Sequence, residues 1–201
     1  GRLLRACNVK RGLGTIRQDV NVSINGGQRV ELKGFQDLSS MPQVVENEMI
    51  RQSNLNDLTK GKTLEPVIVS KYFEKRKFAI ACKLIGWKGI LGTKESKKNH
   101  VRMGRELADY AIKAGVKGLM HSDELPAYGI SEKETRKIHE ILDCKKDDAF
   151  VLIFGEENMV KDAINRVIER VKTAGVPKEV RRVTPENLTR YIRPMPGASR
   201  M

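Results

Sequence analysis

Two short segments near the start of the chain alternate polar and apolar residues, and their polar members could do chemistry together. These polar residues are Arg17, Asp19, Asn21 and Ser23 in the first segment and Arg29, Glu31 and Lys33 in the second. Magnesium at a nucleotide site is held by one or two carboxylates together with phosphate oxygens, and a Lys or Arg neutralises charge on a transferred phosphoryl group. The residue types therefore suit a nucleotide and metal site. The simpler alternative is the solvated face of an amphipathic hairpin laced by ion pairs.

A β-hairpin around Asn25-Gly26-Gly27 would bring the two segments together. Side chains alternate between the two faces of a strand, so the polar and apolar members of each segment separate. Both polar rows share one face only if the residue numbers of each cross-strand pair add up to an even number. A slip of the pairing by one residue would move every side chain of a strand to the opposite face. A loop over 25–27 meets this condition. The sequence therefore predicts Asn21 opposite Glu31 and Asp19 opposite Lys33.

Beyond the hairpin, Ser40-Met41-Pro42 is typical of a helix start. We expect the helix to carry Met41, Val44, Val45 and Met49 at core spacing. The pattern further predicts a compact α+β unit over residues 65–175. Its expected strands are 66–69, 78–82 and 149–154, and its expected helices are 104–114, 131–142 with a capping box, and 159–171.

Composition narrows the class of protein. The chain has 201 residues, 38 Lys and Arg against 25 Asp and Glu, a formal net charge of +13, and 39% hydrophobic residues. This composition is typical of a globular protein. No apolar run approaches the roughly 20 residues that a membrane-spanning helix needs. The three cysteines form no C-x-x-C pair, and the first residues lack a secretory signal pattern. We expect a cytoplasmic protein with no membrane partner, and the missing initiator Met indicates a fragment or processed chain.

The positive charge is concentrated between residues 71 and 98. The basic residues expected to contact nucleic-acid phosphates there are Lys71, Lys75, Arg76, Lys77, Lys94, Lys97 and Lys98. Lys and Arg in number raise affinity for nucleic acid through counterion release. The stretch 88–100 has no hydrophobic period, so it is interpreted as a mobile cationic loop.

Several motifs resemble the tRNA-dependent amidotransferase B/E family. Segments 14–24 (GTIRQDVNVSI), 30–36 (VELKGFQ) and 48–52 (EMIRQ) resemble its cradle domain, in the family's order and spacing. Segments 117–130 (KGLMHSDELPAYGI) and 148–155 (DAFVLIFG) are similar to the GAD domain, which is also inserted in bacterial-type aspartyl-tRNA synthetases. A cradle interrupted by this insertion is the mark of the family's archaeal E-type branch, and residues 189–201 resemble the return into the cradle.

The resemblance implies a fold and a domain plan. We expect an α+β fold: part of a cradle-type kinase domain over residues 1–64, and a GAD-like two-layer α/β insertion with a mainly antiparallel sheet over 65–178. Residues 179–201 would return into the cradle. Family members are much longer than this chain, so we expect the chain alone to be inactive.

The resemblance also implies a function. Members of the family use ATP and Mg²⁺ to activate glutamate on Glu-tRNA(Gln), and ammonia from an asparaginase-like partner, the D-type amidotransferase subunit, then yields Gln-tRNA(Gln). By similarity, the predicted site comprises Arg17, Asp19, Asn21, Ser23, Glu31 and Lys33. Asp19 or Glu31 would support the metal, and Lys33 or Arg17 would face phosphate. This makes the protein part of an ATP-dependent carbon–nitrogen ligase.

Two alternatives of another class stay open. The chain could be a non-catalytic tRNA-binding module, whose affinity would then depend on salt through the basic residues between 71 and 98. The insertion could instead dock on a partner protein through Asp123, Glu124, Leu125 and Tyr128, although a capped turn also explains these residues.

Overall fold

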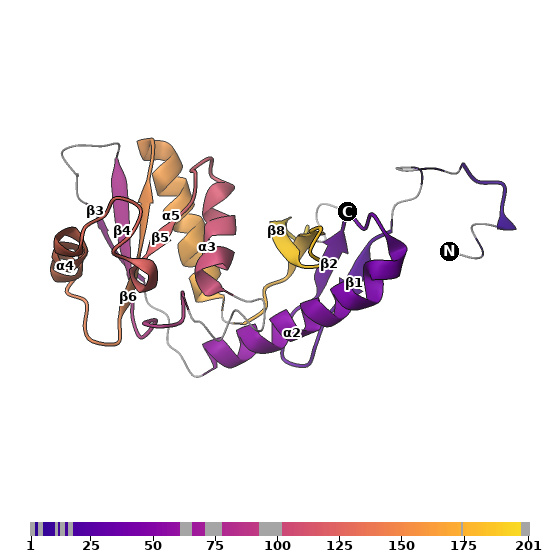
Figure 1. Ribbon diagram of the computed structural model, residues 1–201, viewed down its shortest axis with the longest axis horizontal. Helices are drawn as coiled ribbons and strands as arrows, with labels where there is room; N and C mark the ends of the chain where they lie inside the picture. Colours follow the sequence, from indigo (N-terminus) through magenta and orange to yellow (C-terminus); the bar gives the residue numbers. More distant parts are fainter. Residues whose placement is uncertain are drawn as a thin grey trace.

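Two four-stranded sheets organise the computed structural model, one built from both ends of the chain and one from its middle (Figure 1). The structure describes residues 3, 6–10, 12, 15, 18–60, 66–70, 78–92, 102–173 and 175–197. Within these ranges, no helix combines the length and the apolar character needed to span a membrane.

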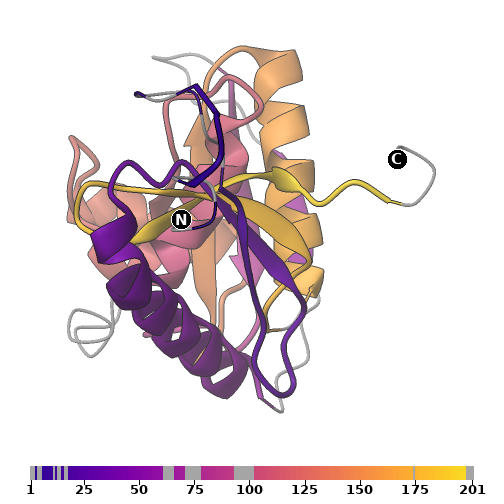
Figure 2. The ribbon, with the colours of Figure 1, turned by 90° about the vertical axis from the view of Figure 1, so that its right-hand side faces the viewer.

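The first sheet has the strand order β1-β2-β7-β8. Its strands are β1 (Val20–Val22), β2 (Val30–Lys33), β7 (Glu179–Val183) and β8 (Thr189–Pro194). The β1–β2 and β7–β8 pairs are antiparallel, whereas β2 and β7 run parallel. Helix α2 (Met41–Thr59) begins with Pro42 in its first turn, as the sequence predicts, and runs alongside this sheet (Figures 1 and 2). Residues far apart in the chain therefore share one sheet.

The second sheet is antiparallel in all its described strands, where the resemblance implies a mainly antiparallel sheet. Its order is β3-β4-β6-β5, with β3 (Pro66–Ser70), β4 (Ala79–Leu84), β6 (Ala149–Phe154) and β5 (Met120–His121). Its helices are α3 (Met103–Ile112), α4 (Glu132–Ile141) and α5 (Glu157–Lys172). The expected strands and helices of this segment are all present, within a few residues of their predicted limits.

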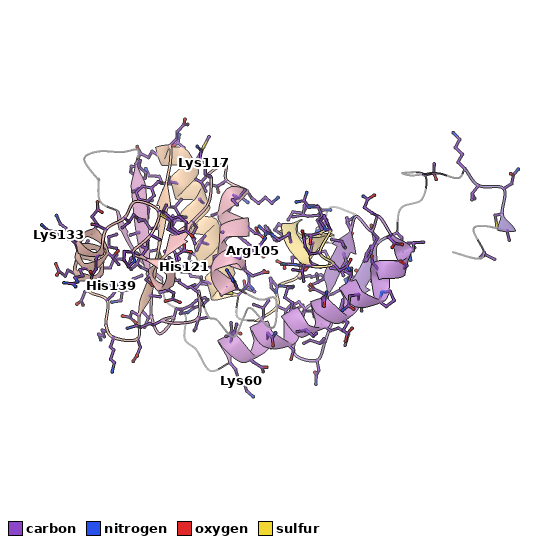
Figure 3. The ribbon with its side chains drawn as sticks, viewed as in Figure 1. Lys60, Arg105, Lys117, His121, Lys133 and His139 are labelled. Carbon is purple, nitrogen blue, oxygen red and sulfur yellow. The ribbon has the colours of Figure 1, made fainter. Side chains whose placement is uncertain are left out.

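The prediction of a two-layer insertion is wrong, because helices cover both faces of the second sheet. Helices α3 and α5 lie on the face that is turned toward the first sheet, and α4 lies on the other face (Figure 1). In β6, Val151 and Ile153 belong to the larger apolar core, while Phe150 and Leu152 pack in a smaller cluster with residues of α4. Figure 3 marks His139 on α4. Its ring meets that of Phe150 edge-on, with ring centroids 5.0 Å apart. An uninterrupted apolar strand needs cover on both sides.

The prediction of a mobile loop over 88–100 is wrong for the first residues of this stretch. Ile90 and Leu91 are buried in the core, 7% and 0% exposed, next to the equally buried Trp87. The backbone amides of Leu91 and of Gly89 donate to the carboxylate of Asp123. The loop start is therefore held by an apolar anchor and a side-chain cap, and residues 93–100 lie outside the described part of the chain.

Candidate functional site

The predicted hairpin register is confirmed. Strands β1 and β2 pair Asn21 with Glu31, and this pair is flanked by Val20 with Leu32 and Val22 with Val30. The side chains of Val22, Val30 and Leu32 are buried in the core. Because neighbouring residues of a strand point to opposite faces, Asn21 and Glu31 lie on the outer face of the sheet.

Three of the predicted site residues meet on this outer face. The Lys33 Nζ atom lies 3.0 Å from Oδ2 of Asp19 and 2.5 Å from Oε1 of Glu31. The hydrogen bonds that Lys33 donates to Glu31 and then to Asp19 raise the pKa of its ammonium group above the ordinary value. The ammonium therefore bridges the two carboxylates, and the three charges together leave one net negative charge.

The remaining predicted residues divide into two groups. Asn21, in the middle of β1, and Ser23, directly after the strand, are exposed. The others lie outside the described residues: Arg17, Lys71, Lys75, Arg76, Lys77, Lys94, Lys97 and Lys98. Their proposed contacts with phosphate stay predictions.

Arg182 is a cation that the sequence analysis missed. It is the register partner of Lys33 in the parallel pair of β2 and β7, and it is exposed. Register partners point to the same face of a sheet, so Arg182 stands beside Lys33 on the outer face. Neighbouring Arg181 is buried. The alternation within β7 could have suggested one exposed arginine, but no sequence signal pairs β7 with β2.

The carboxylates of Asp19 and Glu31 suit magnesium as a partial ligand set. Mg²⁺ keeps several waters and is commonly held by one or two carboxylates plus phosphate oxygens. No cluster of three or more His, Cys, Asp or Glu side chains that could hold a metal occurs in the part of the chain that is described. Two carboxylates and two nearby cations thus match a shared metal and phosphate site better than an all-protein metal cage.

Behind the sheet, a buried cluster of charges joins the two halves of the molecule. Arg51 of α2 bonds Glu48 through Nη2 at 2.7 Å and Nε at 2.9 Å. Arg181 of β7 bonds both carboxylate oxygens of Glu106, on α3, at 2.8 and 2.9 Å, and Oε1 of Glu179 at 2.6 Å. Strand β7 belongs to the first sheet, with α2 alongside it, and α3 covers the second sheet, so these ion pairs fix one half against the other.

The electrostatics of the buried cluster are set by its close partners. Burial raises the pKa of Glu106, but the charges of Arg181 and Arg51 outweigh it and lower this pKa to about 2. For Glu48 the balance is the same, because Arg51 and Arg181 lower its pKa against the effect of burial. Glu48 and Glu106 are therefore ionised in the folded chain. Glu48 and Arg51 stand in the motif 48–52, and no sequence pattern predicted a role for either.

Comparison with known proteins places the whole chain in one group. Residues 2–199 match the family model described as the GatB/GatE catalytic domain. Proteins named as the E subunit of glutamyl-tRNA(Gln) amidotransferase are 41% identical in Methanothermobacter thermautotrophicus, 43% in Methanocaldococcus jannaschii and 42% in Pyrococcus furiosus. Each comparison covers 100% of this chain, but the chain spans only about a third of the relatives' length, 35%, 35% and 36%.

Proposed function

Because the chain belongs to the GatB/GatE catalytic domain family, we propose that it forms part of an amidotransferase subunit that activates glutamate on Glu-tRNA(Gln) with ATP for conversion to Gln-tRNA(Gln). The full-length complex would thus be an ATP-dependent carbon–nitrogen ligase. The observation that supports this most directly is the contact of Lys33 with Asp19 and Glu31 on one sheet face. The relatives' shared name supplies the reaction.

Each residue of the face has a proposed task. Asp19 and Glu31 would hold Mg²⁺, which when bound would supply positive charge to phosphate oxygens. Lys33 and Arg182 would face the transferred phosphoryl group, together with Arg17. Charge builds up on the phosphoryl oxygens during transfer, so fixed cations beside them lower the barrier. Asn21 and Ser23 would offer polar atoms at the edge of the same site.

The proposal includes the domain plan and the partners. Residues 1–64 and 179–201 would belong to the kinase cradle, and residues 65–178 would form the inserted GAD-like domain. The separate sheet of the middle segment supports this division. The insertion would approach tRNA with its basic stretch, ammonia would come from the asparaginase-like D-type partner, and the complex would work in the cytoplasm.

The test is Asp19→Asn in the full-length subunit assembled with its partner. Ammonium salt serves as the nitrogen donor, so that ammonia delivery from the partner is not limiting. We expect ATP-dependent formation of Gln-tRNA(Gln) to fall at least about 100-fold, because a charge that organises the phosphoryl site is lost. The affinity for tRNA, measured separately by filter binding, should change little. Asp57→Asn is the matched control, since Asp57 is an exposed acid on α2.

The rival hypothesis of a non-catalytic tRNA-binding module predicts a different result. In that case Asp19→Asn would leave the rate of Gln-tRNA(Gln) formation at the level of Asp57→Asn. Such a result would rule out a catalytic role for the Asp19 face.

A further inference from the structure

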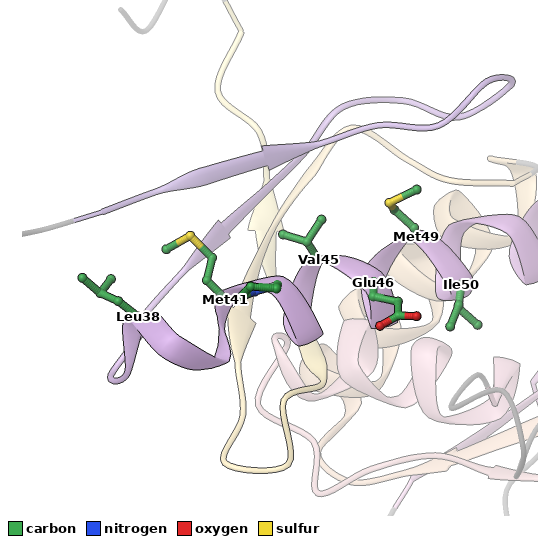
Figure 4. Close-up of a pocket in the computed structure, with 7 residues that line it drawn as sticks. Leu38, Met41, Val45, Glu46, Met49 and Ile50 are labelled. Atoms are coloured by element: carbon green, nitrogen blue, oxygen red, sulfur yellow. The ribbon is translucent and has the colours of Figure 1, made fainter. Parts of the chain in front are cut away.

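One side of helix α2 carries an apolar groove that the described part of this chain leaves open (Figure 4). The lining residues are Leu38, Met41, Pro42, Val45, Glu46, Met49 and Ile50. Leu38 is 50% exposed, Met49 48% and Ile50 38%. The prediction that Met49 packs in the core is therefore wrong, and Met41 is only half-buried, although Val44 is fully buried as expected.

The groove follows the geometry of a helix-packing surface. Its residues recur every three to four positions, so they form one stripe along α2 and the turn before it, about 16 Å long for three turns. Other residues of α2 contact the core of this chain: Val44, Glu48, Arg51 and Leu55 are buried. Of the groove residues, Val45 also packs against the core. Helix α2 therefore has a second packing surface, beyond the one that its own core uses. Such a stripe accepts an apolar segment whose side chains fit between its ridges.

We propose that an apolar segment of the same subunit, from the part of the full-length polypeptide beyond these 201 residues, packs into this groove. The chain spans 35% of the length of its relatives, so most of such a subunit is available to supply the segment. A stable interface between separate chains buries about 800 Å² on each partner, which three helical turns with seven lining residues hardly provide. A segment of the same polypeptide needs less area, because covalent connection raises its effective concentration.

The position of the groove adds a consequence for the sheet face. The amide Nε2 of Gln18 lies 3.8 Å from Sδ of Met41, and Gln18 directly precedes Asp19 in the chain. The segment that covers Met41 would therefore pass close to Asp19, which directly precedes β1. Glu46 is the one charged residue among the described residues that line the groove, so we expect a Lys or Arg of the covering segment beside it.

Methionine oxidation in the isolated full-length subunit tests the proposal without any assay of turnover. Met49 and Met159 are similarly exposed in this chain, 48% and 39%, so Met159 on α5 is a built-in control. Oxidation by dilute hydrogen peroxide follows exposure and is measured for each methionine by peptide mass spectrometry. We expect Met49 to oxidise at least about tenfold more slowly than Met159. In the variant Met49→Lys, the oxidation of Met41 should speed up, whereas Met159→Lys should not affect Met41.

The alternative occupants give other results. Equal oxidation rates for Met49 and Met159 would show an uncovered groove and overturn the proposal. Protection of Met49 that grows with subunit concentration would assign the groove to a second copy and refute it as well. Protection that appears only after a partner protein or tRNA is added would assign the groove to that partner. Only protection in the lone full-length subunit that is independent of concentration, and absent from the 201-residue chain alone, supports a segment from beyond these residues.

Discussion

Replacing Arg181 with Met should destabilise the chain severely. The Arg181 guanidinium is fully buried and donates to Glu106, Glu179 and Thr189. Without it, Arg51 remains as a neighbouring cation, at 3.3 Å from Glu106 and 3.6 Å from Glu179. Breaking a buried ion pair by removing one partner costs about 3–5 kcal/mol, because a charge is left uncompensated. A whole domain is stable by only about 5–15 kcal/mol.

The loss of stability caused by Arg181→Met should depend on pH. Burial raises the pKa of Glu106, but Arg181 and Arg51 lower it to about 2 in the folded chain, against a usual 4.5. A carboxylate with a lowered folded pKa stabilises the fold above its unfolded pKa, and this contribution is lost as the pH falls toward the folded pKa. Without Arg181, burial dominates and the pKa of Glu106 rises. The variant can then relieve the buried charge by protonation, so its deficit should be larger at pH 7 than at pH 4.

Urea unfolding of the 201-residue chain measures this deficit, with the fluorescence of its single tryptophan, the buried Trp87, as the signal. Arg182→Met is the matched control, because Arg182 is the exposed neighbour; its free energy of unfolding should stay within about 0.5 kcal/mol of the wild type. Arg181→Lys keeps the charge but loses the paired hydrogen bonds, so it should lie between the two. A deficit below about 1 kcal/mol at pH 7, or one that does not shrink at pH 4, would refute this account.

Three further predictions concern local structure. Ser131→Ala removes the capping hydroxyl of α4 and should lower the free energy of unfolding by about 1 kcal/mol in urea titration. Gly104→Ala would place a Cβ atom 2.4 Å from Nε2 of His121, so it should lower the melting temperature measured by calorimetry, and an unchanged value would contradict the close packing. Burial raises the pKa of the Cys82 thiol to about 12, so at pH 8 a thiol reagent should label exposed Cys7 in the native chain but Cys82 only after unfolding.

The hairpin register could be predicted from the sequence because it depends on local information. Alternation assigns each side chain of a strand to a face, and the loop around Gly26 allows only even sums of paired residue numbers. Asn21 accordingly pairs with Glu31. The capping box of Ser131 and Glu134 is confirmed for the same reason, since its two residues lie within one helical turn.

The buried charge cluster could not be predicted in this way. Charged side chains are usually exposed, so a sequence pattern assigns Glu106 and Arg181 to the surface. Their burial depends on a contact between residues 75 positions apart. The same limit applies to Arg182, which reaches the outer face through the long-range pairing of β7 with β2.

Helix α2 shows a different limit. Hydrophobic spacing predicts that Met41 and Met49 are covered, but it does not say by what. Val44 and Val45 pack in or against the core as this spacing predicts, whereas the two methionines line an open groove. Spacing therefore predicted the core contacts of Val44 and Val45 and could not separate them from the two methionines that lie outside the core.

The parallel pairing of β2 with β7 has a consequence for the order in which the protein assembles during synthesis. Lys33 pairs with Arg182, and the entire second sheet is encoded between them. At about 5–20 residues per second, the ribosome delivers β7 roughly 7–30 s after β2. During that interval β2 has an open edge, which is a site for aggregation. We expect the middle of the nascent chain to fold first, and the two ends of the chain to pair afterwards. Chaperones should therefore be needed mainly in the interval between the synthesis of β2 and that of β7.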